Sequence, residues 1–151
     1  MRARPGHAIA RAALATVALA AGGPLPAMAG GPAAHGAPRP PEVIVRRVTT
    51  LDTHGHPAHV FRPGSTIQLR IQWTVRHAPS RTRQTTTWTV VYAGQALVRV
   101  SKTAPARDGS WSRVTWVTVT RAPHAGAHIF WGRVAVAGVS SARSIAFTIR
   151  R

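Results

Sequence analysis

The sequence predicts an all-β protein, an antiparallel β-sandwich of about seven strands that forms one domain at residues 42–151. Three observations support this fold class. Apolar and polar residues alternate without a break over residues 66–75, turn residues separate the apolar segments at short intervals, and no segment keeps the 3.6-residue periodicity of an amphipathic helix. A signal peptide and a linker rich in Pro, Gly and Ala are expected before this domain.

Residues 1–29 have the organisation of a secretory signal peptide. Arginines precede a short apolar segment at residues 12–21, and Ala27-Met28-Ala29 supplies a small-residue cleavage site. That segment is too short to span a bilayer, and no later segment reaches about 18 uninterrupted apolar residues. We therefore expect cleavage after Ala29 and a secreted or periplasmic protein with no transmembrane segment in its mature form.

A flexible linker is expected at residues 30–41, where Gly, Pro and Ala dominate and little can be buried. Folded sequence then begins near Glu42. The chain contains no cysteine, which excludes disulfides, thiolate chemistry and cysteine-ligated metal.

The most regular strand is expected at residues 66–75, after a first strand at residues 43–48. Every odd-numbered residue of residues 66–75 is apolar and every even-numbered one is polar, as in a strand with one buried face. Pro63-Gly64 precedes it as a turn signal. The residues expected to face inward are Ile67, Leu69, Ile71, Trp73 and Val75.

Two further strands are expected at residues 85–92 and 95–100, joined by a turn at Ala93-Gly94. The first of them places alternate apolar residues on one face. Its expected inward residues are Trp88, Val90 and Tyr92.

The segment Arg-Asp-Gly-Ser at residues 107–110 predicts a hairpin-type turn, because Asp-Gly tolerates positive φ. A strand is expected next, at residues 111–120. Its alternation breaks, since Trp116 shares a face with Val114 whereas Val117 falls on the other face. We interpret the break as a β-bulge or as a crossing between sheets.

The last two strands are expected at residues 128–137 and 143–149, with turns at residues 123–126 and 138–141. Short strands at this spacing are typical of an immunoglobulin-like arrangement of a sandwich. The expected inward residues are Phe130, Val134, Val136, Ile145, Phe147 and Ile149.

Three segments resemble exported bacterial immunoglobulin-like and fibronectin-III-like modules. They are Phe-x-Pro-Gly-x-x-Ile-x-Leu-x-Ile-x-Trp at residues 61–73, Gly-x-Trp at residues 109–111 and Gly-x-x-Ile-Phe-x-Gly-x-Val-x-Val at residues 126–136. The resemblance implies a sandwich fold and a binding, spacer or adhesion role. It carries over no catalytic residue.

Carboxylates are almost absent from the chain. Its only acidic residues are Glu42, Asp52 and Asp108, whereas it has 20 Lys and Arg residues, so the formal net charge is +17. Most hydrolytic and acid–base chemistry needs paired carboxylates or a carboxylate that orients a histidine. No serine lies in the Gly-x-Ser-x-Gly pattern of a nucleophile elbow. We therefore expect a protein that is not an enzyme and needs no cofactor.

Two explanations of this charge stay open. One is an anionic partner, namely a wall polymer, lipopolysaccharide, extracellular nucleic acid or a membrane surface, because excess arginine attracts polyanions. The other is an acidic habitat, where a protein with few carboxylates has little carboxylate-dependent stability to lose.

Arginines on or beside the expected strands are candidates for a polyanion-binding face, because guanidinium groups bind phosphate and sulfate oxygens bidentately. A diffusely basic surface, which also keeps edge strands from pairing, is the alternative. The candidates are Arg70, Arg76, Arg81, Arg83, Arg113, Arg133 and Arg143.

The tryptophans divide by strand face. Trp73, Trp88 and Trp116 share the faces of core residues and are expected to be buried. Trp111 and Trp131 fall on the opposite faces, so each is a candidate to stack on a sugar or a base. Covering a hydrophobic edge, or facing a partner subunit, are the alternatives for these two.

Histidines cluster in one short segment. His54, His56 and His59 follow Asp52 closely, and imidazole with carboxylate is a donor set for Zn²⁺, Cu²⁺ or Ni²⁺. A solvated loop between strands is the alternative, since the segment also contains Gly and Pro.

The sequence therefore predicts a secreted, non-enzymatic binding or adhesion module with an arginine-rich surface for an anionic cell-surface polymer. Two alternatives accompany this prediction. The first is an exported metal-binding protein that uses the histidine segment. The second is a structural subunit of a surface assembly, in which open sheet edges take up strands of a protein partner.

Overall fold

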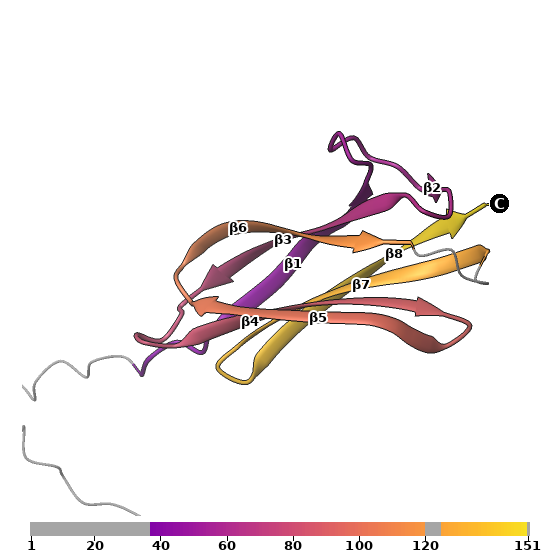
Figure 1. Ribbon diagram of the computed structural model, residues 1–151. Coiled ribbons are helices and arrows are strands. Elements are labelled where there is room, and N and C mark those ends of the chain that lie inside the picture. Colours follow the sequence, from indigo (N-terminus) through magenta and orange to yellow (C-terminus); the bar gives the residue numbers. More distant parts are fainter. Residues whose placement is uncertain (1–36, 120–124, 151) are drawn as a thin grey trace, which may run out of the picture. The chain divides into compact units, whose positions relative to one another are not determined.

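The computed structural model describes residues 37–119 and 125–150. Figure 1 shows that these residues form two stacked layers of strands. No helix occurs among them, so none there is long and apolar enough to cross a membrane. The expected signal peptide, most of the linker and the first half of the expected turn at residues 123–126 lie outside the described residues, and residues 37–41 have no regular secondary structure.

The described part of the chain forms eight strands, which confirms the predicted all-β sandwich. They are β1 (Glu42–Leu51), β2 (Val60–Phe61), β3 (Thr66–Arg76), β4 (Arg83–Tyr92), β5 (Gln95–Pro105), β6 (Gly109–Thr118), β7 (Gly126–Val136) and β8 (Val139–Ile149). Sheet A has the order β1-β3-β6, and sheet B has the order β2-β8-β7-β4-β5. Every pairing is antiparallel except the two-residue pairing of β2 with β8.

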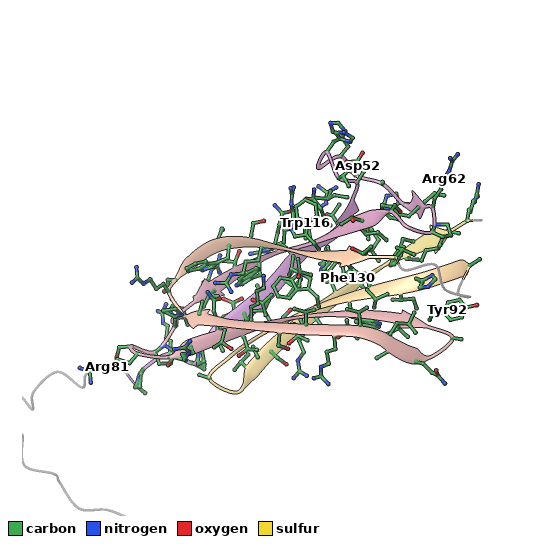
Figure 2. The ribbon with its side chains drawn as sticks, in the orientation of Figure 1. Asp52, Arg62, Arg81, Tyr92, Trp116 and Phe130 are labelled. Atoms are coloured by element: carbon green, nitrogen blue, oxygen red, sulfur yellow. The ribbon has the colours of Figure 1, made fainter. Side chains whose placement is uncertain are left out.

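The inner faces of the two sheets form the core. The strict alternation of β3 holds, and its inward residues from Ile67 to Val75 are all buried to 1% exposure or less. Phe130, Val134 and Val136 of β7 are buried opposite them, as predicted. Figure 2 shows Phe130 between the two layers.

Two buried tryptophans tie the sheets together by hydrogen bonds. Nε1 of Trp73 in sheet A donates to Oε1 of Gln84 in sheet B at 3.0 Å. Nε1 of Trp88 in sheet B donates to the carbonyl oxygen of Leu69 in sheet A at 2.9 Å. The predicted burial of both tryptophans is confirmed. Because each indole N–H has a partner, neither leaves an unsatisfied donor in the core.

The predicted burial of Trp116 is wrong, as is the bulge or crossing predicted in its strand. β6 pairs with β3 without any register shift, and Thr115 lies opposite Leu69, which faces inward. Trp116 and Val114 therefore face outward, and Trp116 is 59% exposed. The register shifts of the described strands occur instead in β1, between Val45 and Arg47, and in the pairing of β4 with β5.

The predicted hairpin at residues 107–110 is also wrong. β5 belongs to sheet B and β6 to sheet A, so this connection carries the chain from one sheet to the other. Gly109 does adopt positive φ, at 135°. The Asp108 side chain serves a different loop, as described next.

Candidate polyanion-binding surfaces

Asp108 fastens the connection between β3 and β4. Its two carboxylate oxygens accept hydrogen bonds from the backbone N–H groups of Ala78, at 2.7 Å, and His77, at 2.9 Å. These two bonds, that of Ala78 first, hold the pKa of Asp108 below its ordinary value of 3.8. Asp108 therefore has a structural role in the described fold.

Asp52 and Glu42 also have partners within the fold. Oδ1 of Asp52 accepts from the backbone N–H groups of His54 and His56, at 2.8 and 2.9 Å. The bond from His56 is the main cause that lowers the pKa of Asp52. Glu42 forms an ion pair with Arg76, 3.5 Å from Oε2 to Nη1. Over residues 37–119 and 125–150, the ion pairs are this one and that of Asp52 with His56, so the other arginines there have no carboxylate partner.

Three arginines line one pocket at the end of the sandwich where β3 passes to β4. Arg81 and Arg83 come from this connection and the start of β4, and Arg107 comes from the crossing between β5 and β6. The backbone N–H of Ala106 donates to the carbonyl oxygen of Thr82 at 2.8 Å and joins the two segments. The pocket, which we call the end pocket, has a volume of about 480 Å³ and is lined by Ser80, Arg81, Thr82, Arg83, Pro105, Ala106 and Arg107.

All three arginines of the end pocket are exposed, and no carboxylate lines it. Figure 2 shows Arg81 at this end of the molecule, away from Tyr92 at the other end. Arg81 adopts positive φ, at 61°, which is uncommon for a residue other than glycine. The residues that line the pocket carry guanidinium groups and, at Ser80 and Thr82, hydroxyls, which together are a donor set for oxyanions.

A second group of arginines lies on the outer face of sheet A, and we call it the arginine stripe. Arg70 lies opposite Val114 and Arg47 opposite Gln72, both at outward positions. Nε of Arg46 donates to Oγ1 of Thr74 at 3.4 Å on the same face. The stripe consists of Arg46, Arg47, Arg70 and Arg76.

Trp116 lies beside the stripe. It lies opposite Gln68, and Arg70 is the next outward residue of β3. Trp116 and Arg70 are therefore diagonal neighbours, which lie about 7–8 Å apart. Figure 2 shows Trp116 on the side of sheet A that faces away from Phe130. An exposed indole ring beside arginine suits stacking on a sugar or a base.

The structure does not gather the other predicted arginines at these surfaces. Arg113 lies opposite Ile71, at an inward position of β6, and is half-buried. Arg133 faces outward on sheet B, where its Nη2 donates to Oγ of Ser140 at 3.1 Å. Arg143 lies on β8 opposite Gly132 and is exposed.

The two tryptophans predicted as stacking platforms differ. Trp111 stacks on Trp73 with 6.4 Å between ring centroids, and its Nε1 donates to the carbonyl oxygen of Arg107 at 3.1 Å, so this ring packs on the core. Trp131 is 44% exposed on the outer face of sheet B. Arg133 lies on the same face, two residues along β7.

The histidine segment forms a short exposed loop after β1. The rings of His54 and His56 stack with 6.3 Å between centroids, and Nδ1 of His56 lies 3.6 Å from Oδ2 of Asp52. His59 is exposed, and its carbonyl oxygen accepts from the backbone N–H of Thr148. Among the described residues, no three His, Cys, Asp or Glu side chains gather as a metal-binding group.

Searches of protein-family models and of curated proteins found no match to this chain. The function is therefore argued from the surfaces themselves.

Proposed function

We propose that this protein is a secreted, non-enzymatic binding module that holds an anionic cell-surface polymer. The observation that carries the proposal is the convergence of Arg81, Arg83 and Arg107 on one pocket that no carboxylate lines. Guanidinium groups form paired, charge-assisted hydrogen bonds with phosphate and sulfate. The expected export signal and the resemblance to immunoglobulin-like and fibronectin-III-like modules agree with a binding role outside the cytoplasm.

The arginine stripe supports a polymer rather than a single ion as the ligand. Arg70 and Arg76 lie at outward positions of one strand, and a strand advances about 3.3 Å per residue, so they are about 20 Å apart. β3 leads from the stripe directly into the connection that carries Arg81. A chain with repeating anionic groups can therefore contact the stripe and the end pocket at once.

The ion pair of Arg76 with Glu42 does not remove Arg76 from this surface. Both side chains are about half exposed, with relative accessibilities of 58% and 44%. Exposed pairs of this kind are worth no more than about 1 kcal/mol, and salt screens them. A phosphate or sulfate group that approaches the stripe can therefore compete with Glu42 for Arg76.

Binding of heparin by two variants with equal charge tests the proposal. The first replaces Arg81, Arg83 and Arg107 by alanine, and the second replaces Arg99, Arg133 and Arg143, which lie outside the end pocket and the stripe. We expect the first variant to bind heparin about tenfold or more weakly than the natural protein, because three charge-assisted contacts are lost. We expect the second to retain most of the affinity. Equal losses in both folded variants would mean that net charge alone drives binding.

A further inference from the structure

An apolar pocket opens between the sheets at the end of the sandwich opposite the end pocket. Its volume is about 250 Å³, and an engineered apolar cavity of about 150 Å³ already binds benzene. Strands β3, β4, β5, β7 and β8 contribute to it, together with the end of β6. The lining residues are Ile67, Leu69, Val90, Leu97, Val98, Val117, Thr118, Val119, His128, Phe147 and Ile149.

The pocket exists because the edge strands β5 and β6 leave the interior partly uncovered. β5 pairs with β4 through a register shift that makes Leu97 an extra residue, and Leu97 is 40% exposed at the mouth. Val98 of β5 and Val117 of β6 face inward but are only half-buried. Burial of such half-covered apolar residues under an apolar ligand lowers the free energy of the complex.

His128 supplies a single imidazole to this apolar wall. It is 1% exposed and lies between two rings, 4.8 Å from Tyr92 and 5.3 Å from Phe147 by ring centroids. Its Nδ1 is 3.1 Å from the carbonyl oxygen of Gly126, and this carbonyl can only accept, so Nδ1 carries the proton of that bond.

Two cations lie at inward positions of the same two edge strands. Nζ of Lys102 on β5 lies 6.0 Å from the ring centroid of Trp88, and Arg113 on β6 is half-buried opposite Ile71. Lys102 lies four residues from Val98 along β5, and Arg113 lies four residues from Val117 along β6. Four residues of a strand span about 13 Å. The opening between β5 and β6 therefore combines an apolar pocket with positive charge at the distance of a short alkyl chain.

We infer that this opening binds an anionic amphiphile, with the alkyl chain in the apolar pocket and the anionic head group at Lys102 and Arg113. This inference does not rest on the proposed polymer binding, since it uses other residues at another place in the fold. Charge complementarity selects an anionic head group over a cationic one, because no carboxylate lines the pocket.

Calorimetric titration of the full protein with decanoate, below its micelle concentration, tests the inference. We expect saturable binding of one decanoate and several-fold weaker binding of decyltrimethylammonium, whose head group the two cations repel. Val98→Phe fills the pocket and is expected to weaken decanoate binding about tenfold or more. Lys102→Ala with Arg113→Ala is expected to weaken decanoate binding about threefold to fivefold but to leave the binding of decanol unchanged.

Leu97→Asp at the exposed mouth is the second variant, in case Val98→Phe does not fold. It places a carboxylate in the path of the ligand and is expected to abolish decanoate binding while heparin binding persists. No saturable binding of decanoate to the natural protein would overturn the inference, as would unchanged affinity in folded Val98→Phe. Unchanged affinity after the two cations are removed would overturn the assignment of the head group.

Discussion

At the residue scale, Gly132 lies where the two sheets pack closely. A Cβ atom there would lie 2.7 Å from Cγ1 of Ile71 and 2.7 Å from Cγ1 of Val48, both side chains of sheet A. Real Cβ atoms do not reach such distances without a shift of their neighbours. The glycine in the middle of β7 thus allows the sheets to pack tightly above it.

We predict that Gly132→Ala destabilises the protein by about 1–3 kcal/mol, the usual cost of overpacking a core. Alanine also lowers the conformational entropy of the unfolded chain, which stabilises the folded protein by only about 0.4–1 kcal/mol. This is too little to make the substitution stabilising. Urea unfolding of both proteins measures the difference. Ile71→Val removes Cδ1, one of the clashing atoms at 2.8 Å, so the two substitutions together should cost less than their separate effects added. Additive costs would contradict this packing.

At the element scale, a strand was predictable from the sequence where only one of its faces is apolar. β3 meets this condition, and all of its inward residues were identified. β6 has apolar residues on both faces, so its own pattern cannot say which face is buried. Pairing with β3 decides this, because Thr115 lies opposite Leu69 and Trp116 is left outside. β2 was missed because its two residues are too few to show any alternation.

The candidate site was predictable only in part, for a related reason. Arg76, Arg81 and Arg83 were identified from the loop that they flank, and Arg70 from its strand. Arg107 was missed, since its position at the same pocket depends on how the crossing between β5 and β6 meets the connection between β3 and β4. Contacts between segments distant in the sequence leave no local pattern.

The loop of the end pocket depends on Asp108, which gives a pH-dependent prediction. The pKa values of Asp52 and Asp108 are both lowered in the folded protein. Their hydrogen bonds therefore contribute full stability above the ordinary pKa of 3.8, and this contribution is lost as the pH falls below it through the folded values. We predict that the unfolding temperature decreases in this range.

Thermal unfolding of the natural protein and of Asp108→Asn, between about pH 2 and about pH 5, measures this contribution. Asparagine keeps one acceptor oxygen but has no charge to lose, so the decrease should be smaller in the variant. It should be smaller still when Asp52→Asn is added. Parallel curves for all three proteins would show that these two carboxylates do not determine the acid stability.

At the scale of the whole molecule, the formal net charge is +17, and part of this positive charge is concentrated at the end pocket and the stripe. The three carboxylates hold two loops and one strand end, so the arginines of the end pocket and most of the stripe stay uncompensated. An acidic habitat would explain few carboxylates but does not require arginines from two distant segments to share a pocket. This convergence favours an anionic ligand.

The most direct test of this account is the salt dependence of binding to single-stranded DNA, a polyanion of known behaviour. The natural protein should bind saturably, and its affinity should fall steeply with salt because each contact releases counterions. Loss of the three arginines of the end pocket should reduce the slope of log affinity against log salt by about 2, at about 0.7 per contact. The equally charged variant at Arg99, Arg133 and Arg143 should keep the slope. Weak binding that disappears by physiological salt, with one slope for all three proteins, would contradict a specific polyanion site.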